Sequence, residues 1–237
     1  MTARPDVTWP RQLRLPGQAA APDGPLDMQT MYLMHHAFRR DLDAFVEAVR
    51  NTPVEDRRTW RLLAQRWELF TEVLHKHHTA EDDVIWPALI ARGSSDDVAV
   101  LESMEAEHEE IDPRLDACRA GFQRLARKPD EDARAALAVR ITAARELLRR
   151  HLAHEETSAI AILQRLVTAE EWAEIEKEIG RETSLRYAVQ VVPWVAHCLP
   201  REVLDRVFHD IDAGFRMIWL LTRRRFARRE ARAFKYG

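Results

Sequence analysis

The sequence of 237 residues is short of glycine, cysteine and long apolar runs, and each shortage excludes a class of protein. Only seven glycines, in a chain dominated by Ala, Leu, Glu and Arg, indicate an almost entirely helical fold. The two cysteines, Cys118 and Cys198, are too few for a disulfide framework. No apolar run has the length of a signal peptide or a membrane span, so we expect a cytoplasmic protein.

Charge is abundant but has no large excess of one sign. The chain has 36 Lys and Arg against 39 Asp and Glu, a formal net charge of −3, which gives no overall indication of a nucleic-acid partner. Five of the eleven prolines lie in residues 1–26. We interpret this segment as an extended arm that either lies along the bundle through Trp9, Leu13 and Leu15 or is disordered.

Four segments between residues 27 and 167 have apolar residues at every third or fourth position, which predicts four amphipathic helices. The first is expected to begin at Leu26 to Asp27, with Asp27 as its N-cap, and to end before Pro53. The second covers about residues 58–91, and a turn at 127–130 separates the third from the fourth. Four helices joined by short loops predict an all-α, up-down four-helix bundle.

Histidines and glutamates interrupt the apolar face of every predicted helix. On the second helix, His77 and Glu81 follow Leu74 at positions where leucine would be expected. Because burial of an unpaired carboxylate is unfavourable, such groups are usually paired, hydrogen-bonded or bound to a metal. The inward-facing polar residues of the four helices are, in chain order, His35, His77, Glu81, His108, His151 and Glu155.

The two halves of this region repeat one design. A helix with a lone inward histidine is followed by a helix with an inward His-x-x-x-Glu pair, and the two histidines are 42 residues apart in the first half and 43 in the second. This repeat of side-chain chemistry predicts two αα-hairpins of one kind. Beyond the glutamates, the apolar faces are expected to continue through Val84 and Ala88 and through Ser158 and Ile162.

The six inward residues predict a dinuclear metal centre. A lone inward histidine is more often a hydrogen-bonded core residue than a ligand, but two matching sets are hard to obtain by chance. If Glu81 and Glu155 each bridge two metals and each metal takes two imidazoles, every metal has four protein donors. Room remains for a bridging solvent oxygen and an open position. Mixed imidazole and carboxylate donors suit two iron ions, with zinc and manganese as alternatives.

Asp112, one turn beyond His108, is either a further ligand or a solvated residue before Pro113, and we favour the solvated interpretation. Other histidines fall off the apolar faces and are interpreted as flanking, surface or supporting residues. They are His36, His75, His78 and His154.

The motifs around these residues resemble the hemerythrin-like, or HHE cation-binding, family over about residues 27–167. They are MHHAFRRDL, HHTAEDDVIWPAL, MEAEHEEIDPRL and HLAHEETSAI. The resemblance implies a four-helix bundle with a non-haem, usually di-iron, centre that binds or reacts with dioxygen or related small ligands. It places the six residues at ligand positions, with both glutamates as bridges. Oxygen-carrying members have a second histidine on the third helix, whereas His108 has Met104 and Asp112 one turn away, which argues against reversible oxygen carriage.

Three kinds of function remain open. The first is a redox enzyme that reacts with peroxide, dioxygen or nitric oxide. The second is a module that senses or stores iron or oxygen and signals through the C-terminal helices, and the third is a structural bundle that holds zinc. No additional acid or base marks a catalytic residue, so none is assigned. We favour small-molecule redox chemistry.

Residues 168–237 are predicted to form a helical extension that packs across one end of the bundle. Thr168 and Glu171 form a capping box, which starts a short helix with Gly180 as the C′ residue. Pro200 begins a later helix.

From Arg216 to Lys235 the chain has eight basic residues and one acid, Glu230. This segment could bind a membrane surface or nucleic acid. We favour a helix that lies on the bundle or projects its charges into water.

Overall fold

A computed structural model describes residues 9–181, 184–211 and 213–237. These residues form helices and no strand, which confirms the expected all-α class. The elements are α1 (Gln29–Asn51), α2 (Arg57–Ala80), η1 (Glu81–Ile85), α3 (Trp86–Ile90), α4 (Ser95–Arg127), α5 (Glu131–His154), η2 (Glu155–Ala159), α6 (Ile160–Leu166), α7 (Ala169–Arg181), α8 (Leu185–Val195), α9 (Arg201–Asp210) and α10 (Ala213–Ala233). The segments η1 and η2 are π-helical.

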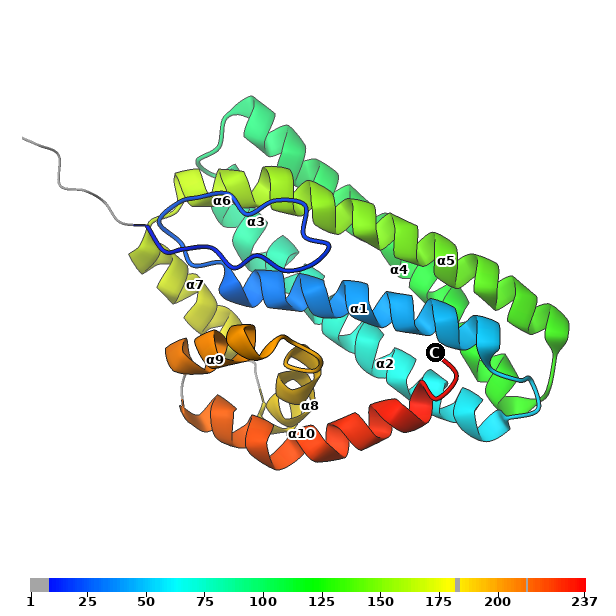
Figure 1. Cartoon of the computed structure of the whole chain (residues 1–237). Helices are drawn as coiled ribbons and strands as arrows, with labels where there is room; N and C mark the ends of the chain where they lie inside the picture. Colours follow the sequence, from blue (N-terminus) through cyan, green and yellow to red (C-terminus); the bar gives the residue numbers. More distant parts are fainter. Residues whose placement is uncertain (1–8, 182–183, 212) are drawn as a thin grey trace, which may run out of the picture.

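Four helical rods form the predicted up-down bundle (Figure 1). The first rod is α1 and the third is α4, whereas the second runs through α2, η1 and α3 and the fourth through α5, η2 and α6. Contacts between α2 and α4, α4 and α5, α5 and α1, and α1 and α2 close the ring of four rods. The bundle is therefore complete before the chain reaches α7.

Side-chain caps explain where three rods begin. The Asp56 carboxylate accepts a first-turn backbone N–H in α2, and the Asp130 carboxylate does the same in α5. Ser94 and Asp97 form a reciprocal capping box at the start of α4.

The first rod begins at Gln29, two to three residues after the predicted start at Leu26 to Asp27. The side-chain amide of Gln164 takes both backbone groups of Leu26, accepting its N–H at 2.9 Å and donating to its carbonyl at 2.9 Å. Leu26 is thereby held outside the helix. The Asp27 carboxylate still accepts the Gln29 N–H at 3.0 Å, but it is not the N-cap.

The N-terminal arm packs against the bundle over its described part, residues 9–28. Leu13 and Leu15 are buried, as the first interpretation of this segment predicted, whereas Trp9 is 54% exposed and contributes little packing. The Ala19 N–H donates to the Glu156 carboxylate of η2 at 2.6 Å. The arm therefore crosses the same end of the bundle as α6 (Figure 1).

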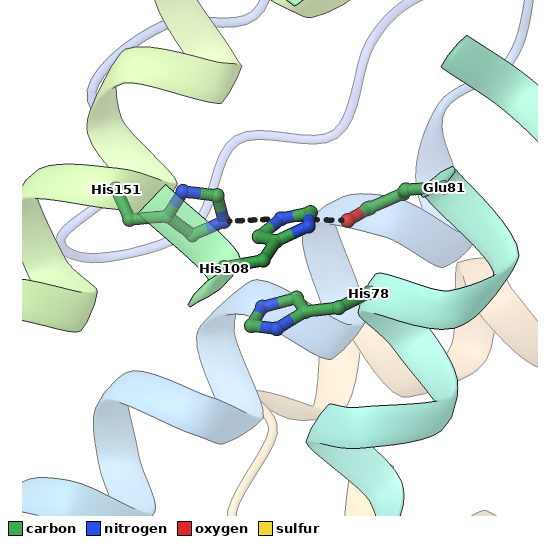
Figure 2. A group of neighbouring side chains, drawn as sticks. All are labelled: His78, Glu81, His108 and His151. Atoms are coloured by element: carbon green, nitrogen blue, oxygen red, sulfur yellow. Dashed lines mark hydrogen bonds and ion pairs between the residues drawn. The ribbon is translucent and has the colours of Figure 1, made fainter. Parts of the chain in front are cut away.

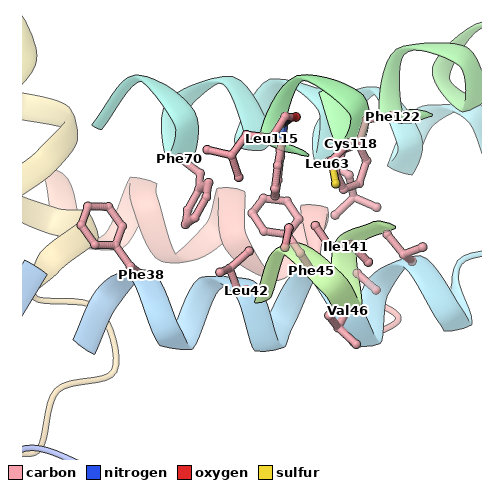
Figure 3. Close-up of a cluster of buried hydrophobic side chains, with 14 of the residues drawn as sticks. Phe38, Leu42, Phe45, Val46, Leu63, Phe70, Leu115, Cys118, Phe122 and Ile141 are labelled. Carbon is pink, nitrogen blue, oxygen red and sulfur yellow. Dashed lines mark hydrogen bonds between the residues drawn. The ribbon is translucent and has the colours of Figure 1, made fainter. Parts of the chain in front are cut away.

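Two apolar clusters fill the bundle, one on each side of a polar layer. Figure 3 shows part of the first, where Phe45 packs with Phe70 and Phe122, and Cys118 is a buried core residue as expected. Every rod passes from one cluster to the other at its inward histidine or glutamate. On the four rods the first cluster reaches Ala37, Leu74, Ile111 and Leu152, and the second reaches Leu33, Ile85, Met104 and Ala159.

The C-terminal helices α8 and α10 lie along the side of the bundle, so the expectation that this region crosses one end is wrong for them (Figure 1). Helix α8 contacts α1, and α10 contacts α2. The reason is a polar anchor on the side of α1, where the buried Trp194 indole donates to the Asp41 carboxylate at 2.7 Å.

Helix α7 continues through Arg181, so Gly180 lies within the helix and is not its C′ residue. The capping box of Thr168 and Glu171 is present. Helix α9 follows Pro200 as predicted. In the described part of the chain, no helix is both long enough and apolar enough to span a membrane.

Candidate metal centre

The polar layer between the two clusters contains all six residues that the sequence predicts to face inward. Five of them are at most 5% exposed, and the His77 side chain is 9% exposed. The Nε2 atoms of His35 and His77 lie 3.3 Å apart, and those of His108 and His151 lie 3.2 Å apart. Four imidazoles from four rods therefore converge in pairs.

The donor atoms form two groups, each with all of its ligand atoms within 4.8 Å of one another. Glu81 belongs to both groups, and Figure 2 shows the one that contains His78. The groups are His35, His77, Glu81 and Glu155, and His78, Glu81, His108 and His151.

The spacing of the donors fits metal ions. Two donors about 2.1 Å from one ion and at right angles to each other are about 3.0 Å apart. The Glu155 Oε2 atom lies 3.0 Å from His35 Nε2, and Glu81 Oε1 lies 3.1 Å from His77 Nε2. The other oxygen of Glu81, Oε2, lies 3.5 Å from His108 Nε2. The two oxygens of Glu81 thus face different groups, which is the geometry of a bridging carboxylate.

Buried atoms without hydrogen bonds provide a second test of the fit. Both oxygens of Glu81, both oxygens of Glu155 and both ring nitrogens of His78 have no hydrogen-bond partner of acceptable geometry. Each buried polar group left in this way costs about 1–3 kcal/mol. A cation at the centre would satisfy acceptors of this kind, so the donor set fits the metal ions that the sequence predicts.

Three further carboxylates orient the histidines from outside the centre. Glu156 lies 2.9 Å from His35 Nδ1, Asp82 lies 2.9 Å from His108 Nδ1, and Glu107 lies 2.9 Å from His151 Nδ1. An acceptor at Nδ1 fixes the tautomer in which Nε2 carries the lone pair, and it orients the ring. The sequence analysis did not single out these three acids. Two of them could have been noticed in the sequence, because Asp82 and Glu156 directly follow the two inward glutamates.

The outer carboxylates connect the two halves of the bundle crosswise. Asp82 belongs to the first half and holds His108 of the second, whereas Glu156 belongs to the second half and holds His35 of the first. Glu156 is itself fixed by Arg39, whose two guanidinium nitrogens donate to it at 2.7 and 2.9 Å. The internal repeat is therefore a repeat of hydrogen bonding as well as of ligand types.

Burial favours the neutral, metal-binding form of three imidazoles of the centre. Burial lowers the pKa of His77 to about 3, with His35 and the other histidines adding to the effect. Burial also lowers the pKa of His78 and of His151. For His35, burial lowers the pKa, but the carboxylates of Glu155 and Glu156 outweigh it and raise the pKa to about 9.

The two inward glutamates respond to burial differently. Burial and the neighbouring Glu155 raise the pKa of Glu81 well above its usual value. Burial also acts to raise the pKa of Glu155, but His35 and the other histidines outweigh it and lower the pKa. Burial and the Glu155 carboxylate thus favour the neutral form of Glu81, whereas a nearby cation would favour its ionised form.

Both inward glutamates begin a π-helical segment, which changes the predicted faces. After Glu81, the buried residues are Ile85, Trp86 and Leu89, while the predicted Val84 and Ala88 are partly exposed. The face moves by one residue because a π turn contains one residue more than an α turn.

The same change follows Glu155. Ala159 is fully buried, whereas the predicted Ser158 is partly exposed and Ile162 remains in the core. Single π turns inside helices are often found at functional sites, and here both begin at the two inward glutamates.

His78 is the donor that the sequence analysis placed outside the centre. It is 3% exposed, and its ring stacks on that of His108 with centroids 3.9 Å apart. The sequence could have indicated this position, because His78 lies three residues before Glu81 and residues three apart share one side of a helix.

The remaining off-face residues lie away from the donor groups. Asp112 and His75 are exposed, with 3.9 Å between Asp112 Oδ2 and His75 Nδ1. His154 is partly exposed and binds Glu107, and His36 is partly exposed. Asp112 belongs to neither donor group, which agrees with the solvated interpretation.

Comparison with known proteins gives one match. The sequence matches the hemerythrin HHE cation-binding domain over residues 27–163, which is more than half of the chain and includes both donor groups. Neither the curated proteins nor the solved structures give a match to the chain. The chain belongs to the hemerythrin HHE cation-binding domain family.

Proposed function

We propose that the centre holds two iron ions and that the protein binds or reacts with dioxygen, peroxide or nitric oxide. The observation that supports this most strongly is the pair of buried four-donor groups that share Glu81. Iron bound there would supply an open coordination position and a change of oxidation state for a small ligand. Mixed imidazole and carboxylate donors favour iron, although zinc and manganese can use the same set.

In this proposal His78 supplies the imidazole that the third rod lacks. The sequence suggested that one metal is short of imidazole, because His108 has no second histidine on its own helix. His78 reaches the same donor group from α2, so that group has three imidazoles and Glu81. The number of imidazoles then gives no argument against reversible oxygen binding, and reactivity has to be measured.

Glu155 is the proposed second bridge. Its carboxylate belongs to the donor group of His35 and His77, and His151 of the other group contributes to the lowered pKa of Glu155. This influence supports a position between the two groups.

The protein side of the mechanism is orientation and exclusion of water. Asp82, Glu107 and Glu156 keep the Nε2 lone pairs of three histidines directed at the centre. The apolar clusters on both sides, which include Phe38 and Met104, limit access of bulk water. These residues would keep a small ligand in a dry, polarising environment.

One observation favours the alternative of a sensor that signals through the C-terminal helices. Neighbouring residues of α1 contact both the centre and the extension, since Arg39 holds Glu156 and Arg40 donates to the His197 carbonyl beyond α8 at 2.7 Å. A change at His35 therefore has a short path to the C-terminal region.

An ultraviolet–visible titration with peroxide tests the proposed chemistry. Iron-loaded protein should show a ligand-to-iron charge-transfer band that changes when peroxide is added. His77→Ala and Glu81→Ala should lose both the band and metal, because each removes a donor. If the protein as purified contains zinc, or if the iron-loaded protein shows no band that responds to peroxide, the redox proposal is contradicted. Zinc in the purified protein would support the structural alternative.

A further inference from the structure

Exposed apolar side chains gather on two C-terminal helices that pack side by side (Figure 1). In the described part of the chain, six of the nine large apolar side chains that are exposed belong to α8 and α10. An apolar patch of this kind on a folded protein indicates an interaction surface. The six are Leu185, Val189, Phe215, Met217, Leu220 and Leu221.

The outer face of α10 combines apolar and basic residues. The inner face packs on the bundle through its buried residues Phe226, Glu230 and Ala233. On the opposite face, residues follow one another at steps of four, three, four and four, which keeps them on one side of an α-helix. They are Met217, Leu221, Arg224, Arg228 and Arg232.

The arginines of α10 are not neutralised by the protein. In the part of the chain that the structure describes, none of its seven arginines forms an ion pair, and all seven are exposed. The single acid of the helix, Glu230, is buried and binds Arg66 at 2.8 Å. Lys235, which follows the helix, binds Asp56 at 2.6 Å. The outward charge of α10 is therefore entirely positive.

We propose that the outer face of α10, together with the exposed residues Leu185 and Val189 of α8, binds the surface of an anionic lipid membrane. Leu221 and Met217, which are 76% and 62% exposed, would enter the boundary between headgroups and acyl chains, and the arginines would bind lipid phosphates and carboxylates. The helix would lie on the membrane without crossing it. This inference does not depend on the metal centre.

The positive charge and the apolar side chains of this face together favour an anionic membrane over a second copy of the chain or nucleic acid. A second copy of the same face would bring two sets of unpaired arginines together, among them Arg224, Arg228 and Arg232, which is repulsive. Nucleic acid would match the arginines but would leave the leucine and methionine side chains in water. Of these three partners, an anionic membrane surface is the one that accommodates both kinds of side chain.

Vesicle sedimentation with the full chain tests the proposal. Binding is compared for phosphatidylcholine vesicles with and without phosphatidylserine, at low and high salt. We expect binding to the phosphatidylserine vesicles that weakens at high salt, and little binding to pure phosphatidylcholine.

Two double variants and a matched control separate the contribution of the apolar side chains to vesicle binding from that of the arginines. Met217→Ser with Leu221→Ser should weaken binding at least about tenfold, because the apolar insertion is lost. Arg224→Gln with Arg228→Gln should weaken it about tenfold or more and reduce its salt dependence. Val139→Ser, at an equally exposed valine of α5, should bind like the parent protein. Metal content should be the same in all of them.

The proposal is overturned if the protein does not sediment with phosphatidylserine vesicles, or if the Met217 and Leu221 substitutions leave vesicle binding unchanged. It is also overturned if the same apolar substitutions instead abolish a dimer seen by light scattering. Binding of duplex DNA that depends on the arginines, without vesicle binding, would likewise contradict it.

Discussion

His78 and His75 lie close together on α2 but in opposite environments. The His75 side chain is 70% exposed, whereas His78 is buried with both ring nitrogens unpartnered. If His78 is a ligand, His78→Ala should bind one metal ion per chain where the parent protein binds two, as measured by elemental analysis. His75→Ala is the control and should keep two. An unchanged metal content in His78→Ala would remove this residue from the centre.

Tyr32 carries a buried hydroxyl group without a partner. The residue is 1% exposed, and burial together with Glu156 and Glu155 raises its pKa. Because an unsatisfied buried donor is unfavourable, Tyr32→Phe should leave the free energy of unfolding of the metal-free protein unchanged or raise it by up to about 1 kcal/mol. Tyr236→Phe, which removes a hydrogen bond to Asp56, should lower it slightly. A loss of more than about 1 kcal/mol in Tyr32→Phe would show that its hydroxyl has a partner.

At the scale of the elements, the helical period predicts the four rods and the side that each turns inward. His77, Glu81 and the matching pair in the fourth rod lie where the period places them. Immediately after Glu81 the helical period no longer predicts the buried face, since Ile85 is buried where Val84 was expected to be. A π turn adds one residue to the helix without any change in composition, so a pattern that assumes regular α-helix has no means of detecting it.

The crosswise bond from η1 to α4 can be tested at Asp82. This carboxylate holds His108 and is 26% exposed, so its replacement should disturb packing little. Asp82→Asn should lower metal affinity about 10- to 100-fold, because a neutral amide oxygen is a weaker acceptor for the His108 Nδ1–H than a carboxylate and so favours the correct tautomer and orientation of the ring less. Competition with a metal chelator measures the change.

Asp83→Asn provides the control, because Asp83 is the exposed neighbour of Asp82 in η1. Its metal affinity should match that of the parent protein. Equal affinities for all three proteins would mean that Asp82 does not support a ligand.

For the whole molecule, the position of the C-terminal extension depends on contacts that no local pattern reveals. Trp194 and Asp41 are 153 residues apart in the chain, and the buried carboxylate of Asp41 also accepts from Arg66 and Arg40. The sequence therefore predicts a helical extension but not the side of the bundle on which α8 and α10 pack. The six inward-facing residues of the polar layer were predictable because each lies on a regular helical face and the design occurs twice.

The Asp41 network should contribute strongly to stability. Asp41→Asn deprives the buried Arg66 of one of its two carboxylates and should lower the free energy of unfolding by about 3 kcal/mol. Asp43→Asn, which affects a more exposed pair with Arg149, should cost less than about 1 kcal/mol. Denaturant unfolding of the two variants measures both effects, and equal losses would contradict a special role for Asp41.

The contribution of Asp41 should also depend on pH. Burial raises its pKa, but Arg66 and Arg40 outweigh burial and lower it. A lowered pKa in the folded state gives stability that is present above the unfolded value of about 3.9 and is lost as the pH falls through the folded pKa. The stability difference between the parent protein and Asp41→Asn should therefore shrink at acid pH. A difference that stays constant with pH would contradict the ionised form of Asp41.

The most direct test of the whole proposal is the metal content of protein purified without added metal, measured by elemental analysis together with its thermal stability. Two donor groups that share Glu81 predict two metal ions per chain, mainly iron, and a lower melting temperature once the metal is removed. A folded protein that holds no metal, or that never binds more than one ion per chain, would contradict a dinuclear centre.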